Sequence, residues 1–172
     1  QTNHRGLNKT DEWLNRIYSP NYYLERLKEE IHRSRRYSHA LSAILLDVDQ
    51  FHQINQQYSY QEGDKILTLI VTIIKNCVRN VDIIARYSGD RFLIILPNTN
   101  QRESFELGER IRSQIISRTK KSTRFHTPIS TTIAVGQCKD DINSLEFIQL
   151  LEKTLRVGKL EERNKVYAIN SG

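Results

Sequence analysis

Apolar residues recur along the chain at spacings that predict alternating helices and strands. Short, almost continuously apolar runs predict strands at residues 41–48, 129–135 and 166–169. Two further runs, residues 81–85 and 92–96, flank a Ser-Gly-Asp centre and predict a β-hairpin. Apolar positions at helical spacing predict five helices, marked by Tyr23, Leu27 and Ile31, by Phe51, Ile54 and Tyr58, by Ile66, Ile70, Ile73 and Cys77, by Phe105, Ile111 and Ile115, and by Leu145, Ile148, Leu151 and Leu155.

The order of these elements is helix, strand, helix, helix, hairpin, helix, strand, helix, strand. This order predicts an α/β sandwich in which helices cover a mostly antiparallel sheet. Residues 1–11 are expected to form a polar lead-in or linker, and residues 12–172 a single domain. We expect Ser19 and Pro20 to begin the first helix as its N-cap and first helical residue. We expect Gly136 to end the strand that precedes it.

Length and composition are those of one globular domain. The chain has 172 residues, of which 38% are hydrophobic and 27% are charged. No apolar run is long enough to span a bilayer, and no signal-peptide pattern is present, so we expect a cytoplasmic location. Because the sequence begins with Gln, we expect a piece of a longer, multidomain or membrane-anchored protein, with flanking regulatory domains. The two cysteines form neither a disulfide framework nor a zinc pattern.

The net charge of +6 favours anionic partners such as nucleotides, nucleic acid or acidic lipid. Basic residues concentrate at positions 33–36 and 118–124, which also fits solvated helix ends and a loop. No aromatic residues interleave with either run, so a stacking platform for single strands is not indicated. We therefore expect no nucleic-acid partner.

Carboxylates follow two of the predicted strands. Asp47 and Asp49 end the first apolar run, and Asp90 lies in the hairpin turn. If these strand ends are neighbours, they form a small cluster of hard oxygen ligands that suits Mg²⁺. Gly89 is expected to adopt a positive φ or to let a ligand approach the backbone closely. Arg91 puts a fixed positive charge where a metal site favours another carboxylate.

Four segments match a family signature in order and in spacing. They are residues 46–55 (LDVDQFHQIN), 58–67 (YSYQEGDKIL), 86–92 (RYSGDRF) and 159–166 (KLEERNKV). They resemble the motifs D-x-D-x-F-K-x-I-N-D, Y-G-H-x-x-G-D-x-x-L, R-Y-G-G-D-E-F and A-K-x-x-G-R-N-R-V of GGDEF domains. These domains are diguanylate cyclases, which condense two GTP into cyclic di-GMP. The resemblance covers about residues 12–169 and implies a ferredoxin-like βααββαβ core with added elements.

The resemblance also implies roles for individual residues. The metal ligands are Asp47, the backbone carbonyl of Val48, and Asp90, and the two carboxylates are catalytic. The substrate-binding residues are Asn55 and Asp64 at the guanine edge and Lys159 and Arg163 at the phosphates. The two basic residues are expected one helical turn apart, on one face. Mg²⁺ is implied as the cofactor when GTP is bound, and a homodimer is implied for cyclisation.

Several positions depart from the family pattern. Arg91 stands where members that cyclise GTP carry Glu, which changes the local charge by two units and removes a metal contact. Ser88 replaces the first Gly of the signature, and His52 replaces a phosphate-binding Lys. These departures predict a degenerate, catalytically impaired domain that still binds nucleotide.

Arg79 and Asp82 fit the R-x-x-D pattern of the family's product-binding inhibitory site. An arginine supplies a planar fork suited to phosphate and to guanine, and a carboxylate accepts from guanine N–H groups. Arg110, on the following helix, lies where some relatives offer another arginine. The structural alternative, without a ligand, is that Arg79 is a helix C-terminal charge and that Asp82 caps the start of a strand.

Three functional readings follow. The first is a sensor of cyclic di-GMP at Arg79 and Asp82, with GTP retained in the former active-site pocket as a variant of this reading. The second is an atypical active cyclase in which Asp49 or Glu62 supplies the missing carboxylate. The third is a dimerisation module without a ligand.

Overall fold

The computed structural model describes residues 15–121 and 128–170, and its elements follow the predicted order. The helices are α2 (Tyr22–Tyr37), α3 (Phe51–Tyr58), α4 (Tyr60–Cys77), α5 (Gln101–Lys120) and α6 (Ser144–Glu161). The strands are β1 (Leu41–Val48), β2 (Ile83–Ser88), β3 (Arg91–Pro97), β4 (Thr131–Gln137) and β5 (Val166–Ala168). The lead-in predicted for residues 1–11 and part of the basic run at 118–124 lie outside the described residues.

The strands form one sheet in the order β2-β3-β1-β4-β5. Strand β1 pairs antiparallel with β3 and β4, and β2 pairs antiparallel with β3. Only β4 and β5 run parallel among the described strands. The expected mostly antiparallel sheet is therefore confirmed. The succession from β1 to β4 is βααββαβ, to which α2, α6 and β5 are added.

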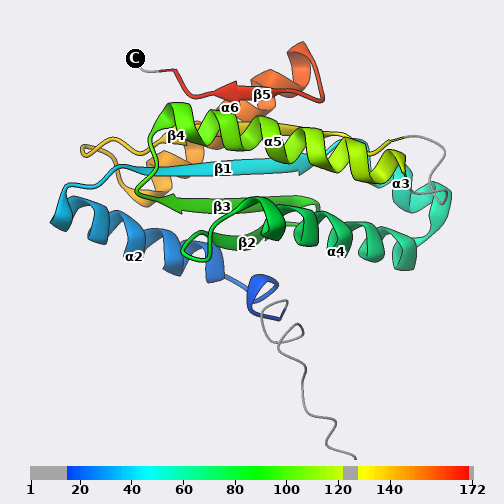
Figure 1. Ribbon diagram of the computed structural model, residues 1–172, viewed down its shortest axis with the longest axis horizontal. Coiled ribbons are helices and arrows are strands. Elements are labelled where there is room, and N and C mark those ends of the chain that lie inside the picture. The colour runs from blue at the N-terminus through cyan, green and yellow to red at the C-terminus, as the bar shows by residue number, and fades with distance from the viewer. Residues whose placement is uncertain (1–14, 122–127, 171–172) are drawn as a thin grey trace, which may run out of the picture.

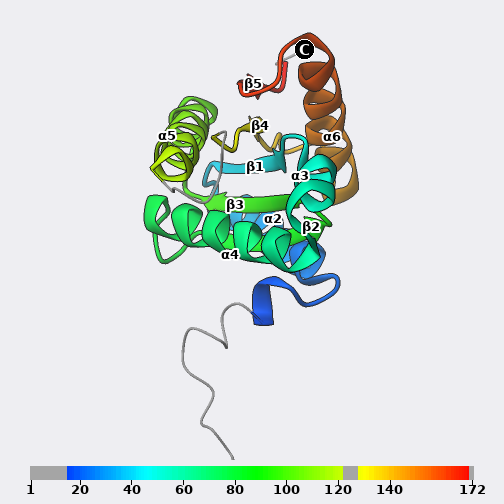
Figure 2. The same cartoon turned by 90° about the vertical axis from the view of Figure 1, so that its right-hand side faces the viewer.

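Helices cover both faces of the sheet (Figures 1 and 2). On one face, Ile111 of α5 and residues of α4 pack against Ile44 of β1. On the other face, Leu27 of α2 and Leu151 of α6 pack against Leu45. All eight residues of β1 are buried, as expected for a strand that is covered on both sides. No helix in the described part of the chain is long and apolar enough to cross a lipid bilayer.

Several predicted boundaries are wrong. Helix α2 begins at Tyr22, after Asn21 in a left-handed conformation (φ 60°), and not at Ser19 and Pro20. Ser19 instead closes the preceding turn, because its hydroxyl donates to the Asn15 carbonyl oxygen at 3.0 Å. Strand β2 begins two residues later than predicted and extends to Ser88, which leaves Val81 outside the strand and 60% exposed.

Gly136 lies inside β4 and does not end it. A Cβ at this position would lie 2.3 Å from Cδ1 and from Cγ1 of Ile169, which covers the strand. The glycine is thus required by close packing and not by a turn.

Replacement of Gly136 by Ala is expected to lower the free energy of unfolding by about 1–3 kcal/mol, because the methyl group overpacks a buried contact. Urea denaturation measures this change. Gly89→Ala is the matched control, since a Cβ there would meet nothing within 4 Å. Equal losses in the two variants would contradict the packing explanation.

Candidate functional site

The end of β1 and the hairpin turn between β2 and β3 lie side by side. Asp47 faces Arg91 in the register of β1 and β3, and the Val48 N–H donates to the Asp90 carbonyl oxygen at 3.1 Å. The two strand ends that carry carboxylates are therefore neighbours. Gly89 does not adopt the expected positive φ, since none of the described glycines does. Its missing side chain leaves the turn open, because a Cβ there would have no neighbour within 4 Å.

Asp47 is buried, with only 1% of its surface exposed, and two cations contact it. Its Oδ2 accepts from Nζ of Lys159 and lies 3.5 Å from Nε of Arg91. Burial raises the pKa of the Asp47 carboxyl above its usual range, Asp90 raises this pKa further, and Lys159 opposes the shift. The carboxylate that resembles a metal ligand is thus held by the protein's own cations.

The other carboxylate oxygen of Asp47, Oδ1, is buried and has no hydrogen-bond partner among the described residues. An orphaned oxygen beside Asp90 is a hard ligand of the kind that Mg²⁺ prefers. The described part of the chain contains no group of three or more His, Cys, Asp or Glu residues able to hold a metal. Since Mg²⁺ is commonly held by one or two carboxylates together with substrate phosphates, this small donor set fits a nucleotide-borne ion.

Lys159 and Arg163 do not share a helical face, which corrects the expected spacing. Helix α6 ends at Glu161, and its C-cap, Glu162, is extended. Arg163 therefore follows the helix, and its guanidinium lies 3.8 Å from Oδ1 of Asp49. The two basic side chains thus meet two different carboxylates, Asp47 and Asp49.

Asp49 serves to join strands, a role that the sequence did not reveal. It is nearly buried and accepts hydrogen bonds from the Ser130 hydroxyl at 2.7 Å and the Thr132 hydroxyl at 2.6 Å. The backbone N–H of Asn164, which has a left-handed conformation, donates to it at 3.1 Å. The suggestion that Asp49 replaces a missing metal ligand is disfavoured, because its oxygens already accept from β4 and from the loop before β5.

Asp49→Asn is expected to lower the free energy of unfolding by about 2–3 kcal/mol, because an amide cannot accept all three hydrogen bonds. Urea denaturation followed by circular dichroism measures the loss. The exposed Asp141→Asn is the control and should change stability by less than about 0.5 kcal/mol. A stable Asp49→Asn variant would argue against this joining role.

Asn55 and Gly63 bring α3 and α4 together beyond the end of β1 (Figure 1). A Cβ on Gly63 would lie 1.9 Å from Oδ1 of Asn55, so glycine is required for this approach. The Asn55 Oδ1 atom is buried and has no hydrogen-bond partner among the described residues. Asp64 follows Gly63 and is exposed. Asn55 therefore lies against Gly63, the residue that precedes Asp64 in α4, and it has an unused acceptor.

Arg79 and Asp82 form an ion pair immediately after α4. The Arg79 guanidinium donates to Asp82 Oδ1 at 2.9 Å, and the Arg79 backbone N–H donates to Oδ2 at 2.8 Å. The same guanidinium donates to the Pro97 carbonyl oxygen and, at 3.0 Å, to the Thr99 hydroxyl. The Asp82 side chain is 2% exposed and that of Arg79 is 52% exposed. Sequence reasoning missed Thr99 because it lies 20 residues from its partner.

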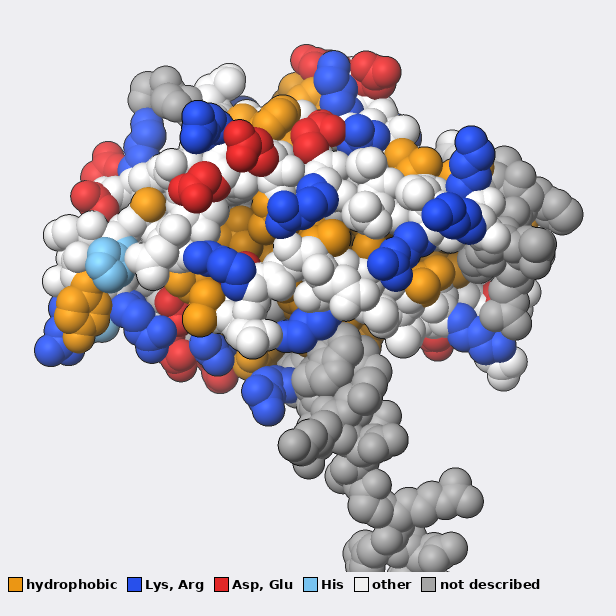
Figure 3. All heavy atoms as spheres, in the orientation of Figure 1, with side chains coloured by type: hydrophobic (Ala, Val, Ile, Leu, Met, Phe, Trp, Pro, Cys, Tyr) orange, Lys and Arg blue, Asp and Glu red, His pale blue; other side chains and the backbone are white. Residues whose placement is uncertain are grey.

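A cavity of about 250 Å³ opens beside this pair. Arg110 of α5 lines it together with Arg79 and Asp82, and donates to the Cys77 carbonyl oxygen at 2.8 Å. Lys and Arg side chains gather on the face of the molecule that carries α4 and α5 (Figure 3). The structure thus places Arg79, Asp82 and Arg110 around one opening.

Residues 10–165 match the family described as "Diguanylate cyclase, GGDEF domain". The chain belongs to the GGDEF family. Diguanylate cyclase DosC of Escherichia coli is 30% identical to it over 165 residues, which cover 94% of this chain and 34% of DosC. Diguanylate cyclase A of Treponema denticola is 29% identical, over 91% of this chain and 43% of that protein. This GGDEF chain therefore spans a third to less than half of the length of these relatives.

Solved GGDEF domains share its fold. The GGDEF domain of DgcB from Caulobacter crescentus, in complex with c-di-GMP, superimposes with a TM-score of 0.81 at 21% identity, covering 88% of this chain and 90% of that chain. The active GGEEF domain of a diguanylate cyclase from Vibrio cholerae has a TM-score of 0.82 at 21% identity, covering 91% and 99%. At this identity the likeness supports the fold alone.

Proposed function

We propose that this chain is a catalytically impaired GGDEF domain that senses cyclic di-GMP through Arg79 and Asp82. The observation that carries the impairment is the contact of Arg91 with Asp47, whose Nε and Oδ2 atoms are 3.5 Å apart. The choice of ligand is supported by the half-exposed guanidinium of Arg79 and the carboxylate of Asp82, which line the same cavity. Together they offer donors and acceptors that suit guanine and phosphate. The DgcB relative was solved with c-di-GMP.

The impairment has an electrostatic basis. Two unit charges 4 Å apart interact by about 4 kcal/mol at an effective dielectric constant near 20. Solvent screening reduces this to about 2 kcal/mol for each unit of charge. Because an arginine in place of a glutamate changes the local charge by two units, Arg91 disfavours a bound cation by about 4 kcal/mol. A barrier change of this size is about a thousandfold in rate.

GTP in the former active-site pocket is a variant of this proposal. Asn55 and Asp64 would accept from the guanine edge, and Lys159 and Arg163 would meet the phosphates after leaving their carboxylate partners. Mg²⁺ carried by the nucleotide would be held by Asp47, Asp90 and the Val48 carbonyl, and would neutralise phosphate charge.

In this variant, Asp64→Ala is expected to weaken GTP binding at least about tenfold, since a bidentate acceptor for guanine is lost. Calorimetric titration with GTP and Mg²⁺ measures the affinity. The affinity for cyclic di-GMP is the internal control and should not change. Unchanged GTP affinity would remove Asp64 from the guanine site.

An active cyclase is the alternative function. It requires another carboxylate in place of the one that Arg91 displaces. Asp49 already accepts from Ser130, Thr132 and Asn164, and Glu62 pairs with Lys65 at 3.2 Å. The geometry therefore favours the sensor over the enzyme. A homodimer would serve either function, and flanking domains of a longer protein would carry the response.

The test is calorimetric titration of the purified chain with cyclic di-GMP and with GTP, each with and without Mg²⁺. The sensor proposal predicts binding of cyclic di-GMP with a dissociation constant of about 1 µM or tighter, independent of Mg²⁺. Absence of heat with both nucleotides would favour a dimerisation module without a ligand.

A further inference from the structure

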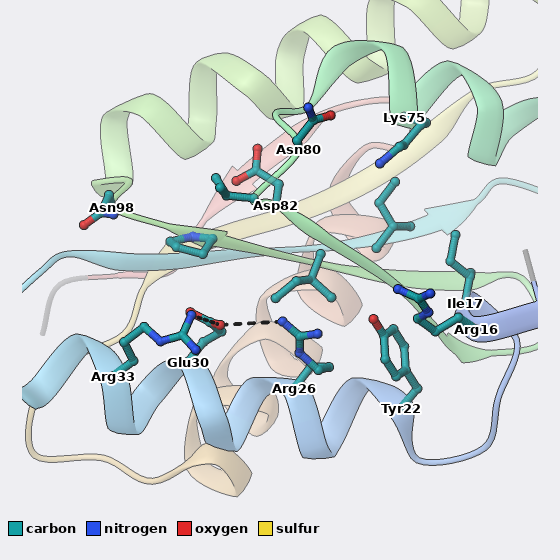
Figure 4. Close-up of a pocket in the computed structure, with 14 residues that line it drawn as sticks. Arg16, Ile17, Tyr22, Arg26, Glu30, Arg33, Lys75, Asn80, Asp82 and Asn98 are labelled. Carbon is teal, nitrogen blue, oxygen red and sulfur yellow. Dashed lines mark hydrogen bonds and ion pairs between the residues drawn. The ribbon is translucent and has the colours of Figure 1, made fainter. Parts of the chain in front are cut away.

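A second and larger cavity lies between α2 and the neighbouring ends of α4 and β2, outside the site described above (Figure 4). Its volume is about 430 Å³, which is within the range of small-molecule sites. It shares one wall residue, Asp82, with the cavity at Arg79. Two of its lining residues, Arg33 and Asp82, belong to the basic run at 33–36 and to the R-x-x-D pattern, but neither pattern predicts a cavity here.

Part of its lining is apolar. Ile17, Ile83 and Ile84 are buried core residues that contribute to its walls, and Pro97 lies beside them. The ring of Tyr22, at the start of α2, faces the same end of the cavity as Ile17 (Figure 4). Such a surface favours an organic body over a fully hydrated ion, because burial removes apolar area from water.

The charged lining has an excess of cations. Four basic residues line the cavity, Arg16, Arg26, Arg33 and Lys75, together with two acidic residues, Glu30 and Asp82. Both acids are already neutralised. Glu30 is 2% exposed and lies 3.0 Å from Arg33 and 3.7 Å from Arg26, and Asp82 pairs with Arg79 outside this cavity.

Arg16 and Lys75 are solvent-exposed cations of this lining that form no ion pair with a described residue. Within residues 15–121 and 128–170, neither side chain has an acidic or hydrogen-bond partner in the structure. They come from different segments of the chain and line the same end of the cavity, Arg16 near Tyr22 and Ile17, and Lys75 on the opposite wall formed by α4 (Figure 4). Two unpaired cations next to an apolar wall are complementary to a doubly charged anionic group attached to an organic body.

We propose that this cavity binds a small phosphomonoester with an aromatic body. The phosphate lies between Arg16 and Lys75, and the body lies against Tyr22 and the isoleucine wall. The proposal does not rest on the function proposed for Arg79 and Asp82, because neither the phosphate contacts nor the aromatic contact involves that pair.

Phenyl phosphate is the probe, and amide chemical shifts of the whole isotope-labelled chain locate it. We expect shifts at Tyr22, Lys75, Asn80 and Ile83, with a dissociation constant of about 1 mM or tighter. The variant that combines Arg16→Gln and Lys75→Gln should bind at least about tenfold more weakly. The matched control combines Arg102→Gln and Lys153→Gln, two exposed residues outside the cavity with the same total charge change, and should retain the affinity within about twofold.

Two further ligands separate the contributions. Inorganic phosphate should bind at least about tenfold more weakly than phenyl phosphate, because it lacks the apolar body. Equal weakening in the two double variants would show that only overall charge matters and would overturn the site. Absence of binding at about 10 mM probe, or shifts confined to residues 88–91 or to the surroundings of Arg79, would also overturn it.

Discussion

Arg79→Ala is expected to weaken cyclic di-GMP binding at least about 100-fold, which corresponds to about 2.8 kcal/mol. The guanidinium is the only group at this cavity that combines a planar donor fork with a buried carboxylate partner in the described structure. Its removal takes away the donors for phosphate and guanine and leaves Asp82 without its cation. Calorimetric titration of the variant measures the loss.

Two further variants make this result specific. Arg79→Lys keeps the charge but not the fork and should recover only part of the affinity. Arg102→Ala removes an exposed arginine of α5 that pairs, within the described part of the chain, with the exposed Glu106 at 3.8 Å, and this variant should bind as the wild type does. Unchanged affinity in Arg79→Ala, with the fold intact by circular dichroism, would refute the site.

Arg91→Glu is expected to form cyclic di-GMP from GTP at a rate at least about 100-fold above the detection limit that bounds the wild-type rate. The substitution removes the guanidinium that lies 3.5 Å from Asp47 and adds a carboxylate beside Asp47 and Asp90. The expected gain is below the thousandfold estimated from charge alone, because Ser88 and His52 also depart from the family pattern. Chromatographic analysis of the products with GTP and Mg²⁺ measures the rate.

Arg91→Gln separates the removal of a cation from the addition of a ligand. It should give a rate between those of wild type and Arg91→Glu, because it removes the repulsion without supplying a metal contact. If Arg91→Glu forms no cyclic di-GMP, the variant that combines Ser88→Gly with Arg91→Glu tests whether the turn also blocks the reaction. If this double variant binds GTP but still forms no cyclic di-GMP, Arg91 is not the cause of the impairment.

The sequence predicted the order of elements because apolar periodicity reports directly on burial. Strand β1 is apolar throughout and is buried on both faces, so its pattern was unambiguous. The helix start predicted at Ser19 and Pro20 is wrong. These residue types fit an N-cap and a first helical position, but the Ser19 hydroxyl donates to the preceding turn. The local sequence predicts Gly136 as a strand end, although glycine is required there by the packing of Ile169, which lies 33 residues further along the chain.

The candidate site was predictable in part. Motif spacing predicted Asp47, Asp90, Arg79 and Asp82 as candidates, and the pairing of β1 with β3 brings the first two close together. The tertiary contacts were not readable from local sequence. Lys159 reaches Asp47 across 112 positions, and Asn164 bonds to Asp49 across 115. Such contacts depend on how α6 and β5 return to the sheet, which periodicity does not encode.

The most direct test of catalytic impairment is the amount of cyclic di-GMP formed when concentrated wild-type protein is incubated with GTP and Mg²⁺. We expect no product above that of a protein-free control, while cyclic di-GMP added to the same preparation is bound. Sustained conversion of GTP over many turnovers would contradict it, because Arg91 would then be compatible with the reaction that its charge is expected to prevent.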